Sequence, residues 1–193
     1  MGAFIVNYQV RSGSLAAVRE VLKSLVTAQA YVSPPKNGWV TVYDEESDSQ
    51  DDAVLRRIAA GLSRALKTDV IGFMVHDSDI AMYWLYRAGA LLDEFSSAPD
   101  YFGNAVDDAT RERLRGENEI LLPLCVSGTT VEAIDAALHP AEEATFAEDY
   151  LAMLAALLGI DERRINLSFE YFVNEGKDIL DDASEFESVS REG

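Results

Sequence analysis

The sequence lacks residues on which several common kinds of protein depend. Cys125 is the only cysteine among 193 residues, so no disulfide can form within the chain and a reducing compartment is expected. No apolar run approaches the roughly 20 residues of a membrane-spanning helix. The first ten residues lack the basic segment and the long apolar stretch of a secretion signal. We therefore expect a soluble, cytoplasmic protein without membrane contact.

Positive charge is also scarce. Lys and Arg number 16 against 34 Asp and Glu, and the formal net charge is −18. A field of this sign repels nucleic acid phosphates and anionic lipids, so direct binding to either is not expected. Basic protein surfaces and cations remain as partners, although a high net charge also serves solubility by itself.

Recognisable catalytic motifs are missing as well. The chain has no Walker A sequence, no G-x-G-x-x-G, G-x-S-x-G or H-E-x-x-H, and no C-x-x-C. Its two histidines, His76 and His139, exclude a multi-histidine metal site within one chain. Cys125 lies in an apolar stretch without a basic neighbour, which favours a buried side chain over a nucleophile. No cofactor is expected.

Apolar periodicity predicts a mixed α+β fold. In the first strand Phe4, Val6, Tyr8 and Val10 share one face, and Asn7 and Gln9 lie on the other, as in a half-buried strand. Strands are predicted at 3–10, 28–33, 39–43, 70–75, 80–86, 89–95 and 165–173, and helices at about 15–26, 54–66, 107–115, 129–138 and 140–158.

The first 75 residues therefore run strand, helix, strand, strand, helix, strand. This order resembles that of ferredoxin-like domains, a fold that hosts many unrelated activities and implies no function. We expect an antiparallel sheet with helices on one face, extended by a hairpin through His76 to Asp79 and covered by the C-terminal helices. A three-layer α/β arrangement is the alternative. Residues 1–176 are expected to form a single domain, and the acidic segment 177–193 a flexible tail.

The turn from His76 to Asp79 follows a predicted buried strand, where functional residues often lie. If Asp77 and Ser78 occupy the turn, His76 and Asp79 face each other across the hairpin. Ordinary turn chemistry explains these residue types. The alternatives are an acid/base site and a hard-cation site with Asp77 and Asp79 as oxygen ligands.

Two further segments are candidate binding surfaces. The loop 44–52 contains Asp44, Glu45, Glu46 and Asp48 without a basic residue, and is either solvated or a contact for a basic partner. The segment 93–103 combines Asp93 with Phe95, Tyr101 and Phe102. These aromatic side chains either enter the core or form a recognition surface.

These observations favour a non-enzymatic interaction module, such as an adaptor, an inhibitor or an immunity-type protein, that docks a basic partner. One alternative is a metal-dependent or acid/base enzyme with its site at His76, Asp77 and Asp79. The other is a nucleic-acid mimic, which requires carboxylates in phosphate-like rows.

Overall fold

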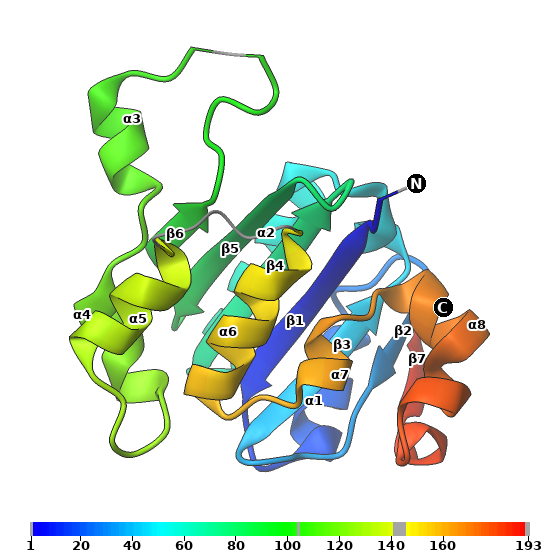
Figure 1. The fold of residues 1–193 in the computed structure, drawn as a ribbon. Helices are drawn as coiled ribbons and strands as arrows, with labels where there is room; N and C mark the ends of the chain where they lie inside the picture. Colours follow the sequence, from blue (N-terminus) through cyan, green and yellow to red (C-terminus); the bar gives the residue numbers. More distant parts are fainter. Residues whose placement is uncertain (1, 104, 141–145, 192–193) are drawn as a thin grey trace.

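A computed structural model describes residues 2–103, 105–140 and 146–191 (Figure 1). Seven strands form one sheet in the order β6-β5-β4-β1-β3-β2-β7, and every neighbouring pair is antiparallel. The strands are β1 (Ile5–Arg11), β2 (Gln29–Val32), β3 (Trp39–Asp44), β4 (Asp69–His76), β5 (Ile80–Arg87), β6 (Ala90–Ser96) and β7 (Glu187–Ser190).

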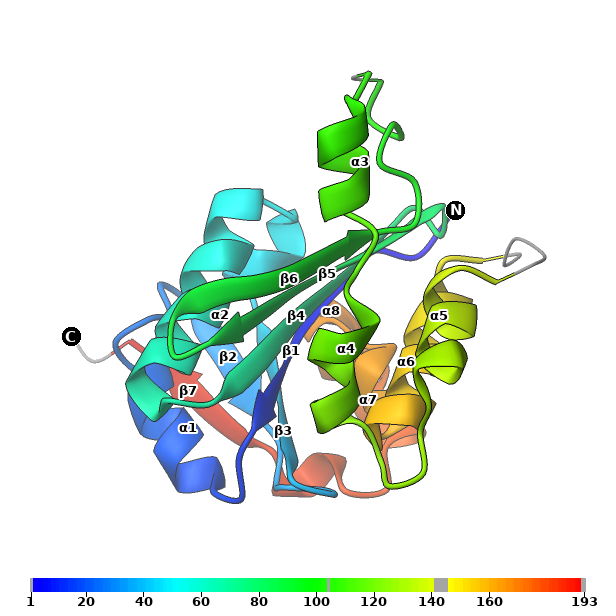
Figure 2. The same cartoon turned by 90° about the vertical axis from the view of Figure 1, so that its left-hand side faces the viewer.

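Helices cover both faces of this sheet. In Figure 2, α1 and α2 lie on one side and α4 to α8 on the other, whereas α3 projects beyond the end of β6. The helices are α1 (Leu15–Leu22), α2 (Asp52–Leu66), α3 (Asp108–Arg113), α4 (Asn118–Leu121), α5 (Val131–Leu138), α6 (Glu148–Leu158), α7 (Glu162–Ile165) and α8 (Phe169–Ile179), with 3₁₀ turns η1 (Glu46–Ser49), η2 (Leu122–Leu124) and η3 (Ala183–Glu185). The expected α+β class is confirmed. The elements form three layers, with the antiparallel sheet in the middle and helices on each face.

Local sequence signals explain several element ends. The hydroxyl of Ser14 accepts the Ala17 N–H and caps α1. Asn37 and Gly38 both adopt positive φ, as the turn of the β2–β3 hairpin requires. Gly159 ends α6 in the left-handed conformation, and the Ile160 N–H donates to the Ala155 carbonyl at 2.9 Å.

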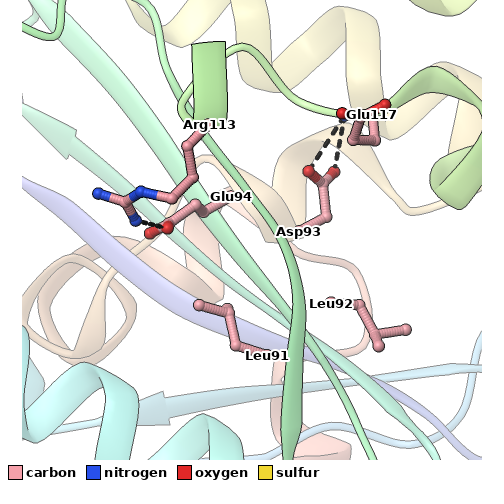
Figure 3. A pocket seen from close by; sticks show the side chains of 6 residues that line it. All are labelled: Leu91, Leu92, Asp93, Glu94, Arg113 and Glu117. Atoms are coloured by element: carbon pink, nitrogen blue, oxygen red, sulfur yellow. Dashed lines mark hydrogen bonds and ion pairs between the residues drawn. The ribbon is translucent and has the colours of Figure 1, made fainter. Parts of the chain in front are cut away.

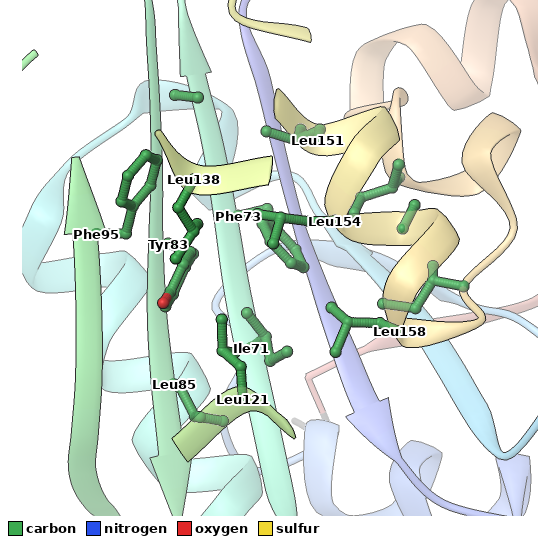
Figure 4. Close-up of a cluster of buried hydrophobic side chains, with 14 of the residues drawn as sticks. Ile71, Phe73, Tyr83, Leu85, Phe95, Leu121, Leu138, Leu151, Leu154 and Leu158 are labelled. Atoms are coloured by element: carbon green, nitrogen blue, oxygen red, sulfur yellow. The ribbon is translucent and has the colours of Figure 1, made fainter. Parts of the chain in front are cut away.

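Side-chain alternation along the strands divides the core between the two faces. On one face, Val6, Tyr8 and Val10 pack with the apolar stripes of α1 and α2. Figure 4 shows the other cluster, in which strand residues Ile71, Phe73, Tyr83, Leu85 and Phe95 meet Leu121, Leu138, Leu151, Leu154 and Leu158 from the helices.

The half-buried first strand predicted from the sequence is wrong. Asn7 and Gln9 are 0% exposed, because α7 and the segment after it cover their face of β1. The Asn7 amide donates to the carbonyls of Ile165 and Leu167 at 2.6 and 3.1 Å. Polar side chains at these positions therefore serve hydrogen bonding inside the protein rather than hydration.

The C-terminal quarter also differs from expectation. Residues 165–173 do not form the predicted strand. They comprise the end of α7, a short connection and the first half of α8. Instead β7 pairs with β2 and closes that edge of the sheet. The segment 177–193 was expected to be a flexible tail, yet Phe186 and Val189 within it are buried.

Helix α6 begins later than the sequence predicts. Phe146, expected to be buried by a helix starting at Pro140, is exposed, and α6 begins at Glu148. Residues 141–145 of that expected helix lie outside the described residues.

Within the described ranges, no helix combines the length and hydropathy needed to cross a bilayer.

Candidate functional site

The His76–Asp79 turn joins β4 to β5 as predicted and anchors the start of the chain. Asp77 and Ser78 both adopt positive φ, and the Asp79 N–H donates to the His76 carbonyl at 3.0 Å. The Asp77 carboxylate accepts the Gly2 N–H at 3.1 Å, and the Ser78 hydroxyl accepts the Ala3 N–H at 2.8 Å. These bonds offset the cost of left-handed backbone at two residues other than glycine.

His76 and Asp79 do not form the expected pair across the hairpin. The His76 Nδ1 lies 2.6 Å from Oε1 of Gln50, whose own amide nitrogen donates to the Val75 carbonyl. Because Oε1 can only accept a hydrogen bond, Nδ1 of His76 is the donor. The Asp79 carboxylate instead accepts the Tyr101 hydroxyl at 3.0 Å.

The turn meets the segment 93–103 and forms an aromatic patch, defined here as Phe4, His76, Tyr101 and Phe102. Ring centroids of Phe4, Tyr101 and Phe102 lie 5.0, 5.8 and 5.3 Å from that of His76, all in edge-to-face geometry. Phe4, Tyr101 and Phe102 remain 41%, 36% and 55% exposed. The patch thus brings together two segments that the sequence suggested separately.

Carboxylates flank the aromatic patch. Asp77 and Asp79 are exposed, and among the described residues neither forms an ion pair. Rings bordered by unpaired carboxylates provide apolar contact together with attraction for Lys or Arg.

The acidic loop 44–52 binds several of its carboxylates to groups of the chain itself, whereas Glu45, Asp51 and Asp52 are exposed. Asp44 is fully buried and accepts the Ser47 N–H and hydroxyl, and burial raises its pKa. Glu45 accepts the Gln29 N–H, and Glu46 pairs with Arg57 at 2.7 Å.

Asp48 binds the start of α8. Its two carboxylate oxygens accept the N–H groups of Phe169 and Glu170 at 3.2 and 2.8 Å. Burial raises the pKa of Asp48 to about 6. Three carboxylates of the loop therefore stabilise the fold, and the exposed ones stay candidates for contact with a basic partner.

Asp93, the remaining acidic candidate, is also buried. It accepts the Tyr83 hydroxyl at 2.5 Å and the Glu117 N–H at 3.1 Å, and burial raises its pKa. Figure 3 shows the adjacent pocket of about 260 Å³, where Arg113 pairs with Glu94. This pocket is lined by Leu91, Leu92, Asp93, Glu94, Arg113 and Glu117. The buried carboxylates of Asp93 and Glu94 are therefore both bound by other residues of the chain.

A metal site at the turn receives no support. In the part of the chain that the structure describes, no group of three or more His, Cys, Asp or Glu side chains could hold a metal ion. Asp77 and Asp79 stand without a third ligand.

Sequence reasoning missed two contributors to the site. Phe4 was assigned to the apolar face of β1, and Gln50 to a polar loop. No local pattern marks either, because both reach His76 only through strand pairing and the loop that precedes α2.

Comparison of the chain with models of protein families, with curated proteins and with solved structures gives no match.

Proposed function

We propose that this chain is a cytoplasmic interaction module, of the adaptor, inhibitor or immunity type, that docks a protein with a basic surface. The observation that carries the proposal is the aromatic patch around His76 with Asp77 and Asp79 beside it. Contiguous exposed aromatic side chains are typical of interaction sites. Phe and Tyr faces also attract Lys and Arg.

The charge of the partner follows from the surroundings of the patch. With a net charge of −18, the protein accelerates encounter with basic surfaces and repels acidic ones. The mimicry of nucleic acid has less support, because Asp44, Glu46 and Asp48 of the acidic loop are bound to groups of the chain itself. The chain has a single cysteine, which is compatible with the reducing cytoplasm that we propose as its location.

We also propose that about the first 75 residues form a ferredoxin-like unit within one domain. Support comes from the consecutive antiparallel strands β4-β1-β3-β2 and from α1 and α2, which pack in one cluster on the same face. The domain boundary expected at 176 moves to include β7, because β7 belongs to the same sheet.

Differential capture tests the docking function. Wild type, the Tyr101→Ser/Phe102→Ser double variant and Val173→Ser would each capture proteins from cells of the source organism at low and high salt. Val173 is an exposed apolar residue on α8 outside the patch and is the matched control. We expect a basic protein that binds wild type and the control, is lost from the double variant, and dissociates in high salt. Identical capture by all three proteins at both salt concentrations would refute the proposal.

A further inference from the structure

Helix α6 is apolar around its whole circumference. Among its eleven residues, only Glu148, Asp149 and Tyr150 in the first turn carry a polar group. Leu151, Leu154, Ala155 and Leu158 are buried in the core. Met153 and Leu157 are only partly buried and Ala156 is exposed, so the helix also presents apolar side chains outward. Helices that are hydrophobic on all sides are normally covered on all sides.

The outward side of α6 forms an apolar groove with α5. We call it the α5–α6 groove, and it is lined by Ala133, Ala136, Ala137, Met153, Ala156 and Leu157. Each helix contributes residues at positions i, i+3 and i+4, the spacing with which helices pack on one another. Its volume of about 270 Å³ is below the roughly 300–1,000 Å³ of small-molecule pockets, which favours side chains of a partner as occupants.

Glu132 of α5 and Asp149 of α6 lie one helical turn before the groove residues Ala136 and Met153. Between Arg115 and Arg163 the sequence contains ten acidic residues and no Lys or Arg. Neither Glu132 nor Asp149 forms an ion pair with any described Lys or Arg.

Carboxylates on the other face of the sheet include several with cationic neighbours. On α2, for example, Arg56 pairs with Asp52, and Arg57 pairs with Glu46 of the preceding turn. Carboxylates without cations beside an uncovered apolar groove complement a partner that presents apolar and cationic residues together.

We propose that the α5–α6 groove binds a cationic amphipathic helix of a partner protein. One or two large apolar side chains of that helix lie between α5 and α6, and its Lys or Arg residues face the surrounding carboxylates. This proposal rests on the proposed function in one respect, because both expect a basic partner. The groove itself shares no residue with the aromatic patch.

Titration of the full-length chain with a synthetic peptide tests the proposal. The probe is a helical peptide of 18 leucine and lysine residues, with leucines at positions i, i+3, i+4 and i+7. A peptide with the same composition in scrambled order lacks an apolar face, and one with Glu in place of Lys lacks the charge. We expect calorimetric binding and an increase in helical circular dichroism for the first peptide only, with weaker affinity at higher salt.

Variants locate the binding site. Ala136→Lys places a cation at an exposed groove position, and Ala156→Trp fills the groove without changing charge. We expect each to weaken peptide binding at least tenfold, whereas Ala16→Lys, at an exposed alanine of α1, keeps the affinity of wild type. Having two variants protects the test against a folding defect in either, which thermal unfolding would reveal.

Three results would overturn the proposal. The first is wild-type affinity in both groove variants, and the second is equal binding of the scrambled peptide. The third is self-association that Ala136→Lys abolishes, which would assign the groove to a second copy of the chain. The Tyr101→Ser/Phe102→Ser variant separates the two surfaces, because it should bind the peptide as wild type does. If it alone loses the peptide, the groove proposal fails and the aromatic patch remains.

Discussion

At the scale of single residues, a buried chain of polar side chains joins the sheet to its covering layer. The Asn7 side-chain oxygen accepts from Gln9, and the Gln9 oxygen accepts the hydroxyl of Thr41 on β3. The Asn7 amide continues the chain to the carbonyls of Ile165 and Leu167. These bonds satisfy backbone groups in the irregular segment between α7 and α8, which strand or helix pairing leaves free.

Replacement of Asn7 by Ala should lower the free energy of unfolding by at least about 3 kcal/mol. The change leaves buried groups of Gln9 and of the two carbonyls without partners, and each such group costs about 1–3 kcal/mol. Urea denaturation measures the effect. Asn174→Ala, at an exposed position of α8, is the control and should change stability by less than about 0.5 kcal/mol. A similar loss in both variants would contradict the structural role of Asn7.

Asp48 makes stability depend on pH. Burial raises its pKa to about 6 in the folded protein, whereas the unfolded carboxyl titrates near about 3.9. The folded state therefore binds more protons between these values, and stability falls as the pH rises from about 4 through 6. The Asp48 contribution is most favourable below about pH 4.

Asp48→Asn should remove this part of the pH dependence. Asn keeps an oxygen that accepts from the start of α8 but does not titrate. From pH 7 to pH 4.5, wild type should gain about 1 kcal/mol relative to the variant. The full pKa shift would give about 1.9 kcal/mol over this pH range, and the smaller value allows for solvent screening of the partly exposed Asp48. Parallel pH profiles of the two proteins would show that Asp48 titrates normally.

Cys125 should react slowly in the folded protein. Burial raises the pKa of its thiol to about 11, so only a small fraction is thiolate at pH 8. Alkylation by iodoacetamide, followed by mass spectrometry, should be at least tenfold slower than in the same protein unfolded in urea. Equal rates in the two states would contradict the half-buried environment of this side chain.

At the scale of elements, β7 is the least expected feature. Its four residues pair with β2, and Val189 turns into the cluster formed with α1 and α2. Arg19 of α1 also pairs with Glu187. This short strand covers an edge that would otherwise be free to pair with other chains.

A charge on the inward side of β7 should therefore be costly. Val189→Asp should lower the thermal unfolding midpoint by several degrees, since it buries an unpaired carboxylate. Ser190→Asp, on the exposed side of the same strand, introduces the same charge and should have little effect. A flexible tail would tolerate both changes equally, so differential scanning calorimetry of the pair distinguishes the two descriptions.

At the scale of the whole molecule, charge of one sign opposes compactness. The net charge of −18 produces self-repulsion that salt screens, since the Debye length falls from about 10 Å at 0.1 M to about 3 Å at 1 M. At pH 7, we expect the unfolding midpoint to rise when NaCl is increased over this range. Near pH 4, where about half of the carboxylates are neutral, the rise should be much smaller. A salt effect of the same size at both pH values would point to a cause other than charge.

Local sequence patterns were sufficient for most elements. Alternation and turn residues predicted six of the seven strands, and Ser14 and Gly159 are local signals at the start of α1 and the end of α6. The pattern of 165–173 was misleading, because its apolar residues fit either period. Its helical form depends on Asp48, which lies more than 100 residues away in the chain and binds the first N–H groups of α8.

The candidate site could be predicted only in pieces. His76 to Asp79 and Tyr101 with Phe102 were both recognised, since turns and loop aromatics are local features. Their convergence with Phe4 depends on the pairing of β1 with β4 and of β5 with β6.

The sequence alone determined the α+β class, the scarcity of cations and the positions of most turns, because these follow from composition and from contacts between near neighbours. Tertiary structure decided which carboxylates are internal. Asp44, Asp48 and Asp93 are bound within the protein, whereas Asp77 and Asp79 border an exposed patch. The physical reason is that an acidic side chain has the same local pattern in either setting, and only the groups brought near it by folding determine whether it is buried among hydrogen-bond donors or left exposed.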